Sequence, residues 1–310
     1  MVKCEQEIKD IIIVGGGPAA ITSAIYAARM KRCVWMLYEV LAGQASLTSN
    51  IENYTGFRMI SGSDFTDTLQ DHLDDYDLQP MKEKVLEVRK NDGLFEVKTG
   101  GNLYKSKAVI VASGARHREL GVPGEKEFLG HGVAYCVICD APFFRNKDVA
   151  VVGGGNSALT TALELVKYAS RIYLLSKNEG LMGEQTLIQA VKVSEKIEFV
   201  PSAKILKITG DKFVNGIEFE VKGTAKNLEV RGVFIEIGYI PNSEIIDVKK
   251  NNRNEIIINE RNETSEEGLF AAGDVTNIEI KQIVVAAGEG AKAALAASQY
   301  LDRIGGGYGH

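Results

Sequence analysis

The chain has 310 residues, enough for about two domains, and its content of 45% hydrophobic and 25% charged residues is ordinary for a soluble globular protein. A formal net charge of −5 argues against nucleic-acid binding, which needs clustered lysine and arginine. The apolar runs IIIV and VIVA are too short to span a bilayer, and the charged start MVKCEQEIKD lacks the apolar core of a signal peptide, so we expect a cytoplasmic protein without membrane contact.

The first predicted unit is a β-branched strand, a glycine turn and a helix, in the stretch IIIVGGGPAAITSAIYAA. Gly15, Gly17 and Ala20 have the spacing of a dinucleotide site, in which the backbone approaches a pyrophosphate at the helix N-terminus. Glycine turns also serve helix packing, but the strand and helix around this one favour the nucleotide site. A ribose-binding acid is expected about 20 residues later. Tyr38 stands at that position with Glu39 beside it, so we assign Glu39.

The next predicted strand lies in YKSKAVIVASGARHREL, where it ends at Ser113 and Gly114 and a loop follows. Beyond this loop, VAYCVICDAPFF places two residues between Cys136 and Cys139, with Asp140 next in the chain. A zinc site would need two more ligands, which the 4 scattered histidines do not supply. Two inert core cysteines are the other alternative.

We favour a redox-active pair, because vicinal thiols can carry two electrons as a dithiol and a disulfide. Thiol exchange also needs an acid or base nearby, and Asp140 can provide it. The chain has only 4 cysteines, too few for a secreted disulfide framework, so we expect a reducing compartment.

A second strand, glycine turn and helix follow in VAVVGGGNSALTTALEL, where Gly153, Gly155 and Ala158 repeat the spacing. Further strands are expected at IEFV, VNGIEFEV and VRGVFIEIG. Near the end, GLFAAGDVT predicts a strand that runs into Gly273 and Asp274, and a helix follows over 281–304. Two such units predict an α/β fold with two Rossmann-like, three-layer dinucleotide-binding domains.

Together, GGGPAA, AGQASLTSNIENYTGF, VIVASGARHR, CVICD, GGGNSA, GDVT and KQIVVAAGEGAKAA resemble the low-molecular-weight thioredoxin reductases over essentially the whole chain. This resemblance implies an FAD-binding domain built from both chain ends, residues 1–116 and 246–310. A second domain, residues 117–245, would be inserted into it and would carry the cysteine pair. Homodimers are usual in this family.

The resemblance also implies roles for individual residues. Gln44 and Asn53 would lie along the flavin, Asp274 would bind the ribityl chain, and Gln282 with Ile283 would approach the isoalloxazine. The alternatives are a turn cap for Asp274 and an ordinary helix-start residue for Gln282. Other residues of the matched FAD motifs are assigned to the same site: Gly15, Gly17, Pro18, Ala19, Ser113, Gly114, Gly273 and Lys281.

The resemblance assigns Cys139 to the flavin side and Cys136 to attack on the disulfide of a protein substrate. Since the cysteines must meet both the flavin and a bulky protein partner, a domain rotation is implied.

The electron donor is where the chain departs from the family pattern. NADPH-dependent members end the strand after the second glycine turn in His-Arg-Arg, with a further arginine beyond, and these arginines hold the 2′-phosphate. Here Ser176, Lys177 and Asn178 replace the triplet and Met182 the last arginine, which disfavours NADPH. NADH would need an acid at the strand end, and only Glu179 could reach. The nicotinamide cofactor stays undecided. The resemblance includes relatives that lack these arginines and take electrons from reduced ferredoxin or a deazaflavin, and reduced ferredoxin is the favoured donor.

The sequence therefore predicts an FAD-dependent thioredoxin reductase. One alternative is an NAD(P)H-dependent reductase of the same type or of the alkyl hydroperoxide reductase flavoprotein type, although no N-terminal thioredoxin-like domain is expected. Another is a flavin-bound redox sensor without turnover. In the tail GGGYGH, Tyr308 or His310 could cover a flavin face, and a disordered terminus is the alternative.

Overall fold

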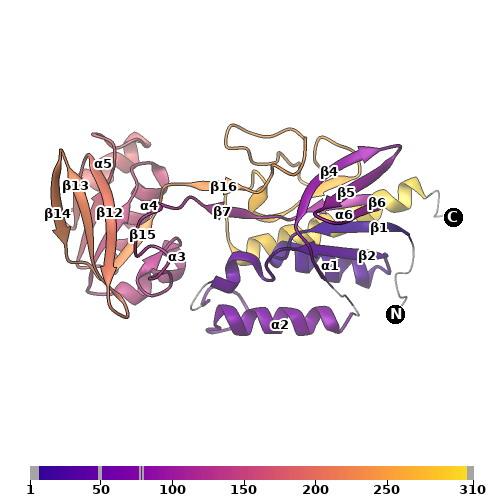
Figure 1. Ribbon diagram of the computed structural model, residues 1–310, viewed down its shortest axis with the longest axis horizontal. Helices are drawn as coiled ribbons and strands as arrows, with labels where there is room; N and C mark the ends of the chain where they lie inside the picture. Colours follow the sequence, from indigo (N-terminus) through magenta and orange to yellow (C-terminus); the bar gives the residue numbers. More distant parts are fainter. Residues whose placement is uncertain (1–6, 48–50, 77, 79, 306–310) are drawn as a thin grey trace. The chain divides into compact units, whose positions relative to one another are not determined.

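The chain divides into two compact units in a computed structural model that describes residues 7–47, 51–76, 78 and 80–305 (Figure 1). Unit 1 comprises Met1–Arg116 and Ile240–His310, and unit 2 comprises His117–Tyr239. The chain returns to unit 1 at residue 240, whereas the family resemblance implied a return at 246. Tyr308 and His310 lie outside the described residues.

Unit 1 is built on one sheet in the order β3-β2-β1-β6-β5-β4, with β17 also paired to β6. The N-terminal half of β6 pairs antiparallel with β5, and its C-terminal half pairs parallel with β17. The strands are β1 (Ile8–Val14), β2 (Val34–Tyr38), β3 (Met81–Lys82), β4 (Val85–Asn91), β5 (Leu94–Thr99), β6 (Leu103–Val111) and β17 (Leu269–Ala271).

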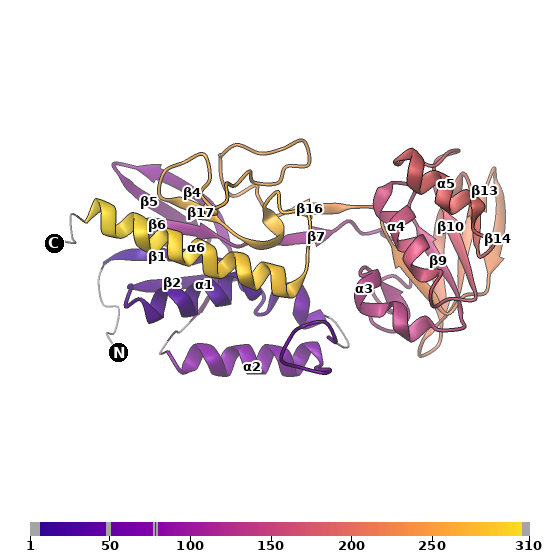
Figure 2. The same ribbon diagram turned by 180° about the vertical axis from the view of Figure 1, so that it is seen from behind.

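The two faces of this sheet have different covers, because successive side chains of β1 point to opposite sides. Ile11 and Ile13 pack with α1 (Pro18–Arg29) and α6 (Ile283–Ile304), whereas Ile12 and Val14 join a separate apolar cluster. The two helices lie side by side (Figures 1 and 2). Small residues allow this approach, since a Cβ on Gly290 would stand 2.2 Å from the carbonyl oxygen of Ala19.

Unit 1 also contains α2 (Gly62–Asp74), whose Leu73 packs in the cluster with α1 and α6. Two 3₁₀ turns, η1 (Gly43–Leu47) and η3 (Gly273–Val275), follow β2 and β17. The predicted helix over 281–304 begins at Ile283, because Gln282 has an extended backbone and caps it.

Unit 2 has a parallel sheet in the order β11-β10-β9-β15-β8. Helices α4 (Asn156–Leu165) and α5 (Gln185–Val193) cover one face, and the antiparallel sheet β12-β13-β14 covers the other. The strands are β8 (Val133–Ala134), β9 (Asp148–Val152), β10 (Arg171–Leu175), β11 (Ile197–Val200), β12 (Ala203–Gly210), β13 (Val214–Val221), β14 (Thr224–Leu228) and β15 (Gly232–Ile235). Short turns α3 (Val137–Asp140) and η2 (Ala141–Phe144) carry the cysteine motif and the segment after it.

These two α/β units confirm the predicted fold class. The expected loop after Gly114 was wrong in part, because it contains the short strand β7 (Ala115–His117), which pairs with β16 (Tyr239–Pro241). Among the helices of the described residues, none has the combination of length and apolar composition that crossing a membrane requires.

Candidate flavin and disulfide sites

The predicted flavin-binding residues of unit 1 follow four neighbouring strands. Strands β1, β2, β6 and β17 run parallel, so their carboxyl ends meet at one edge of the sheet. Gly15 comes after β1, Glu39 after β2, Ser113 after β6 and Gly273 after β17. Ligands of open α/β sheets bind outside this edge. The fold therefore brings together segments that are more than half the chain apart in sequence.

In the first glycine turn, Gly15 is packed closely against the protein, whereas Gly17 at the start of α1 has open space beside it. Gly15 has a φ of +131°, and a Cβ there would stand 2.1 Å from the carbonyl oxygen of Ala112. At Gly17, which caps α1, a Cβ would meet nothing within 4 Å. No side chain caps α1, and Pro18 occupies its first turn. The helix N-terminus therefore offers unshared N–H groups and its dipole to an anion.

The pair Gly15→Ala and Gly17→Ala separates folding from cofactor binding. We expect Gly15→Ala to destabilise the flavin-free protein by about 1–3 kcal/mol, because both the φ and the space exclude a side chain. Gly17→Ala should fold normally but bind FAD at least about tenfold more weakly, since its methyl group enters the open side of the turn. Thermal unfolding of the flavin-free proteins and FAD titration measure the two effects. Equal FAD affinity in Gly17→Ala and the parent protein would contradict this assignment.

Asp274 is placed to accept hydrogen bonds from a ligand. Burial raises the pKa of its carboxyl, and the positive charge of Lys281 opposes this shift. No group of the described chain donates a hydrogen bond to this carboxyl. Lys281 itself donates to the carbonyl oxygens of Asp274 (3.2 Å) and Thr276 (2.6 Å) and pairs with buried Glu255 at 3.3 Å. Lys281 therefore holds the turn after β17 in place.

Two predicted flavin neighbours from opposite ends of the chain contact each other directly. The Asn53 amide donates to the Gln282 side chain at 3.0 Å. Ile283 packs on a small apolar cluster that includes Ile51 and Phe65. The segment around residue 53 is thereby fixed to the start of α6.

The remaining predicted residues of this edge have protein partners as well. Gln44 donates to the carbonyl oxygen of Ala115. Ser113 and Asn242 form a reciprocal pair, in which the Ser113 hydroxyl donates to the Asn242 carbonyl at 2.7 Å and the Asn242 amide donates to the Ser113 carbonyl at 2.8 Å. The Asn242 backbone N–H donates to Gly114 at 3.0 Å. Sequence reasoning missed Asn242, although it ends the run GYIPN.

The predicted ribose-binding residue, Glu39, makes few contacts with the rest of the protein. Its side chain is 62% exposed and pairs with Lys84 at 3.0 Å. Tyr38 lies beside the glycine turn, because its Cβ is 2.9 Å from where a Cβ on Gly16 would stand. A ribose role for Glu39 stays a prediction.

The residues of this edge fit FAD. An uncapped helix start with an open glycine can hold the pyrophosphate, and an acceptor carboxyl without a protein donor can hold hydroxyl groups.

In unit 2, Cys136 and Cys139 form a disulfide with 5.4 Å between their Cα atoms. Cys136 caps α3, and the backbone N–H of Cys139 donates to its sulfur at 3.3 Å. Asp140 closes the same turn through its N–H to the carbonyl oxygen of Cys136 at 3.1 Å. Burial raises the pKa of the Asp140 carboxyl to about 6. A carboxyl with this pKa exchanges protons near neutral pH, as general acid–base catalysis requires.

The residue before the cysteine motif is fixed by contacts that the sequence did not reveal. The Tyr135 hydroxyl donates to buried Glu125 at 2.7 Å, and Glu125 also accepts from the N–H groups of Leu120 and Gly121 at 2.8 Å. The His117 ring stacks on Tyr135 with 4.5 Å between centroids, and burial lowers the pKa of His117 to about 4, so it stays neutral. Tyr135, which directly precedes Cys136, is therefore held by a hydrogen bond and a ring contact.

The second glycine turn keeps its shape without the family's charged clamp. Gly153 has a φ of +152°, and Gly155 starts α4 without a side-chain cap. At the end of β10, buried Ser176 accepts a hydrogen bond from the N–H of Asn178 at 3.2 Å. Lys177 is exposed beside it, as is Glu179 beyond. The structure thus places one lysine and no arginine at this strand end.

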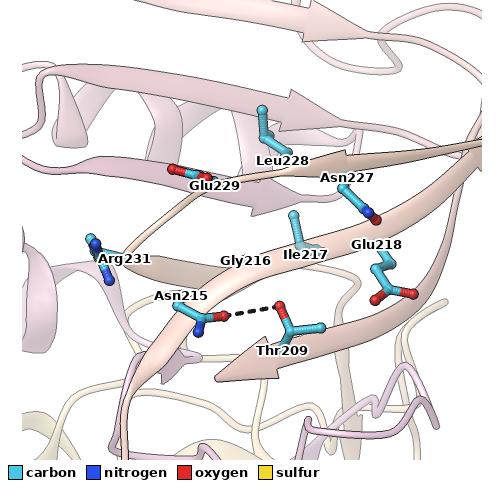
Figure 3. A pocket seen from close by; sticks show the side chains of 9 residues that line it. All are labelled: Thr209, Asn215, Gly216, Ile217, Glu218, Asn227, Leu228, Glu229 and Arg231. Carbon is cyan, nitrogen blue, oxygen red and sulfur yellow. Dashed lines mark hydrogen bonds between the residues drawn. The ribbon is translucent and has the colours of Figure 1, made fainter. Parts of the chain in front are cut away.

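A hollow of about 400 Å³ on the sheet β12-β13-β14 contains none of the predicted site residues (Figure 3). Two of its lining side chains are joined by a hydrogen bond between the Thr209 hydroxyl and Asn215 at 3.1 Å. The lining residues are Thr209, Asn215, Gly216, Ile217, Glu218, Asn227, Leu228, Glu229 and Arg231. Its lining includes no residue of the cysteine motif or of the glycine turns.

Comparison with known proteins identifies a family over nearly the whole chain. Residues 9–290 match the family described as pyridine nucleotide-disulphide oxidoreductase. The chain is 39% identical over 305 residues to the "NADH dehydrogenase" of Bacillus subtilis (strain 168). It is 37% identical over 304 residues to a protein of Staphylococcus aureus (strain NCTC 8325 / PS 47) that is named as a subunit of alkyl hydroperoxide reductase. Each match covers 96% of this chain and 60% of the relative, so the chain spans well under two thirds of their length.

Solved structures of other proteins match nearly the whole of this chain. The thioredoxin reductase of Streptococcus pyogenes MGAS5005 superposes with a TM-score of 0.91 at 32% identity, over 96% of this chain and 99% of that one. A ferredoxin-flavin thioredoxin reductase from Clostridium acetobutylicum gives a TM-score of 0.56 at 29% identity, over 97% and 100% of the two chains. The chain therefore belongs to the pyridine nucleotide-disulphide oxidoreductases, as an FAD-dependent flavoprotein of the low-molecular-weight thioredoxin reductase type.

Proposed function

We propose that the protein reduces a disulfide of thioredoxin through Cys136 and Cys139. The observation that carries this proposal is the disulfide between these residues on a turn that also holds a carboxyl titrating near neutral pH. FAD, when bound, supplies the two-electron carrier between a donor and this cysteine pair.

The contacts within the turn support a division of roles. Once the pair is reduced, the N–H of Cys139 can stabilise a thiolate on Cys136 by donating a hydrogen bond to the charged sulfur. The Cys136 thiolate attacks the partner disulfide, forms a mixed disulfide and releases one partner thiolate, which Asp140 protonates. Cys139 gives up its proton to the same carboxylate and attacks the Cys136 sulfur. This step restores the disulfide and releases the second partner thiolate, which takes the proton that Asp140 received from Cys139, so two electrons and two protons have been transferred.

A second candidate acceptor is a peroxide-reducing protein. The 37% identity with the alkyl hydroperoxide reductase protein of Staphylococcus aureus favours it, although the chain spans only 60% of that relative. Steady-state turnover with purified thioredoxin or with a peroxiredoxin separates the two functions. Turnover with the peroxiredoxin alone would replace the leading proposal.

Two donors other than NADPH have support. The structural neighbour from Clostridium acetobutylicum, named for ferredoxin, favours reduced ferredoxin. The preserved second glycine turn and the Bacillus subtilis relative named NADH dehydrogenase favour NADH. NADPH is disfavoured because a single lysine binds a 2′-phosphate less well than bidentate arginines.

The donor can be tested by following the absorbance of oxidised flavin under anaerobic conditions. We expect reduced ferredoxin or NADH to bleach the flavin at least about tenfold faster than NADPH at equal concentration. The 2′-phosphate of NADPH lacks its charged contacts here, and the loss of one such contact corresponds to about tenfold. Oxidised thioredoxin added afterwards should restore the absorbance. Rapid bleaching by micromolar NADPH would contradict the donor assignment, and a flavin that stays reduced in the presence of thioredoxin would contradict the acceptor.

A further inference from the structure

Glu236 is a carboxyl at the ligand-binding edge of unit 2 that the proposed chemistry does not use. It directly follows β15, which lies beside β9 in the parallel sheet. From β9 the chain passes through α4 to β10 on one side, whereas β15 lies on the other side. The order of the strands reverses at this point, and open α/β sheets bind ligands in the crevice at such a reversal.

The contacts of Glu236 place it against the second glycine turn. A Cβ on Gly153 would stand 2.3 Å from the Glu236 carbonyl oxygen, and the Glu236 N–H donates to Val152 at 2.8 Å. Its carboxyl accepts a hydrogen bond of 2.8 Å from the hydroxyl of Thr161, which is 3% exposed on α4. Backbone and side chain are therefore both fixed between the turn and the helix that would hold a pyrophosphate.

The surroundings of this carboxyl are poor in charge. Burial raises the pKa of Glu236 to about 7, the Thr161 hydrogen bond opposes this shift, and no charged side chain of the described residues contributes. Asp140 on α3, which packs against α4, is partly buried and its carboxyl titrates near pH 6, so the Glu236→Gln variant is needed to assign the pH dependence. The other charged groups of the adjoining elements are engaged or exposed. Glu164 on α4 pairs with Lys167, and Asp148 lies at the far end of β9. On the segment after β10 and at the start of α5, the exposed charged residues are Lys177, Glu179 and Glu184.

We propose that Glu236 controls dinucleotide binding at the second glycine turn, which accepts the ligand with this carboxyl protonated and rejects it with the carboxyl ionised. The N-terminus of α4 attracts the pyrophosphate, but an ionised, partly buried carboxylate that is hydrogen-bonded to the same helix repels this negative charge. Above neutral pH, where Glu236 is ionised, binding of the dinucleotide is then accompanied by the uptake of one proton by this carboxyl. The inference rests on the proposed function only in taking a dinucleotide as electron donor.

Calorimetric titration of the FAD-containing protein with ADP-ribose tests the proposal without reducing the flavin. If only the protonated form binds, the apparent Kd rises about 30-fold from pH 5.5 to pH 8.5, because the competent fraction falls as Glu236 ionises. Glu236→Gln should bind at pH 8.5 as tightly as the parent protein does at pH 5.5. In the parent protein, titrations in two buffers of different ionisation enthalpy should show an uptake of about one proton at pH 8.5.

Thr161→Val provides a second variant that keeps the carboxyl. Removing the hydroxyl takes away the hydrogen bond that lowers the pKa, so the loss of affinity should move to higher pH. A Glu236→Gln protein with the parent's pH profile, or a Thr161→Val protein with an unshifted profile, would overturn the proposal. So would the absence of ADP-ribose binding at every pH.

Thioredoxin reduction by chemically reduced enzyme distinguishes failure of this inference from failure of the proposed function. This reaction starts from reduced flavin and does not use the second glycine turn, so it is measured in the parent protein. If ADP-ribose does not bind but this reaction proceeds, only the inference on Glu236 is wrong. If binding follows the expected pH profile but thioredoxin is not reduced, only the proposed function is wrong.

Discussion

Replacing Cys139 by serine is expected to lower the rate of thioredoxin reduction about a thousandfold or more, because the variant lacks the thiol that resolves the mixed disulfide. Cys136 remains, and its attack on the partner should still form a covalent complex. Mixing the variant with oxidised thioredoxin should therefore trap a mixed disulfide, visible on a non-reducing gel and identified by mass spectrometry. The donor should still bleach the flavin.

Cys136→Ser is the matched control, since it removes the other sulfur of the same disulfide. It should lose turnover to the same extent but trap no partner, because Cys139 is assigned to the flavin side. Trapping by Cys136→Ser in place of Cys139→Ser would reverse the two roles. Residual turnover near the parent rate in either variant would remove the cysteine pair from the mechanism.

The two glycine turns could be predicted from sequence because their cause is local. Each unit lies within about 20 residues and consists of a β-branched run, a glycine turn and a helix. The first glycine of each turn has a positive φ, +131° at Gly15 and +152° at Gly153. The helix that begins at Ile283 was predicted within two residues for the same reason. Elements of this kind depend little on distant parts of the chain.

Features that depend on distant pairing could not be predicted. Strand β17 joins β6 across more than half the chain, and β7 exists only because β16 returns beside it. The contact of Asn53 with Gln282 also joins opposite ends of the sequence. The positions of these residues within motifs were visible, but their partners follow from the fold.

Buried polar groups were the other omission. Glu125 stands in a polar stretch and looks like any surface acid until the fold buries it against Tyr135. Glu236 left a trace, because it is the one charged residue in the apolar run VFIEIG. An acid directly after a buried parallel strand is drawn partly out of water, where it has to be paired or protonated, so this pattern could have marked the residue.

Asp140→Asn is expected to slow thioredoxin reduction by about 100-fold, because the amide can neither transfer a proton to the leaving thiolate nor take up the proton of Cys139. The parent enzyme should show a kinetic transition near pH 6, where the Asp140 carboxyl titrates, and the variant should lack it. Turnover with reduced enzyme from pH 5 to pH 8 measures both effects. An unchanged pH profile in the variant would assign the proton transfer to another group.

The same substitution should stabilise the fold, and the sign follows from the direction of the pKa shift. Burial raises the pKa of Asp140 from 3.8 to about 6, so the folded protein holds this proton more tightly than the unfolded chain does. Below pH 3.8 the Asp140 carboxyl is protonated in both states and does not lower the free energy of unfolding. Above pH 6 it is ionised and its destabilising effect is complete. The asparagine side chain of the variant cannot ionise, so the variant should gain up to about 3 kcal/mol at pH 8 and little at pH 4. Urea unfolding at both pH values tests this, and a variant less stable than the parent at pH 8 would show that the carboxylate is held by favourable contacts.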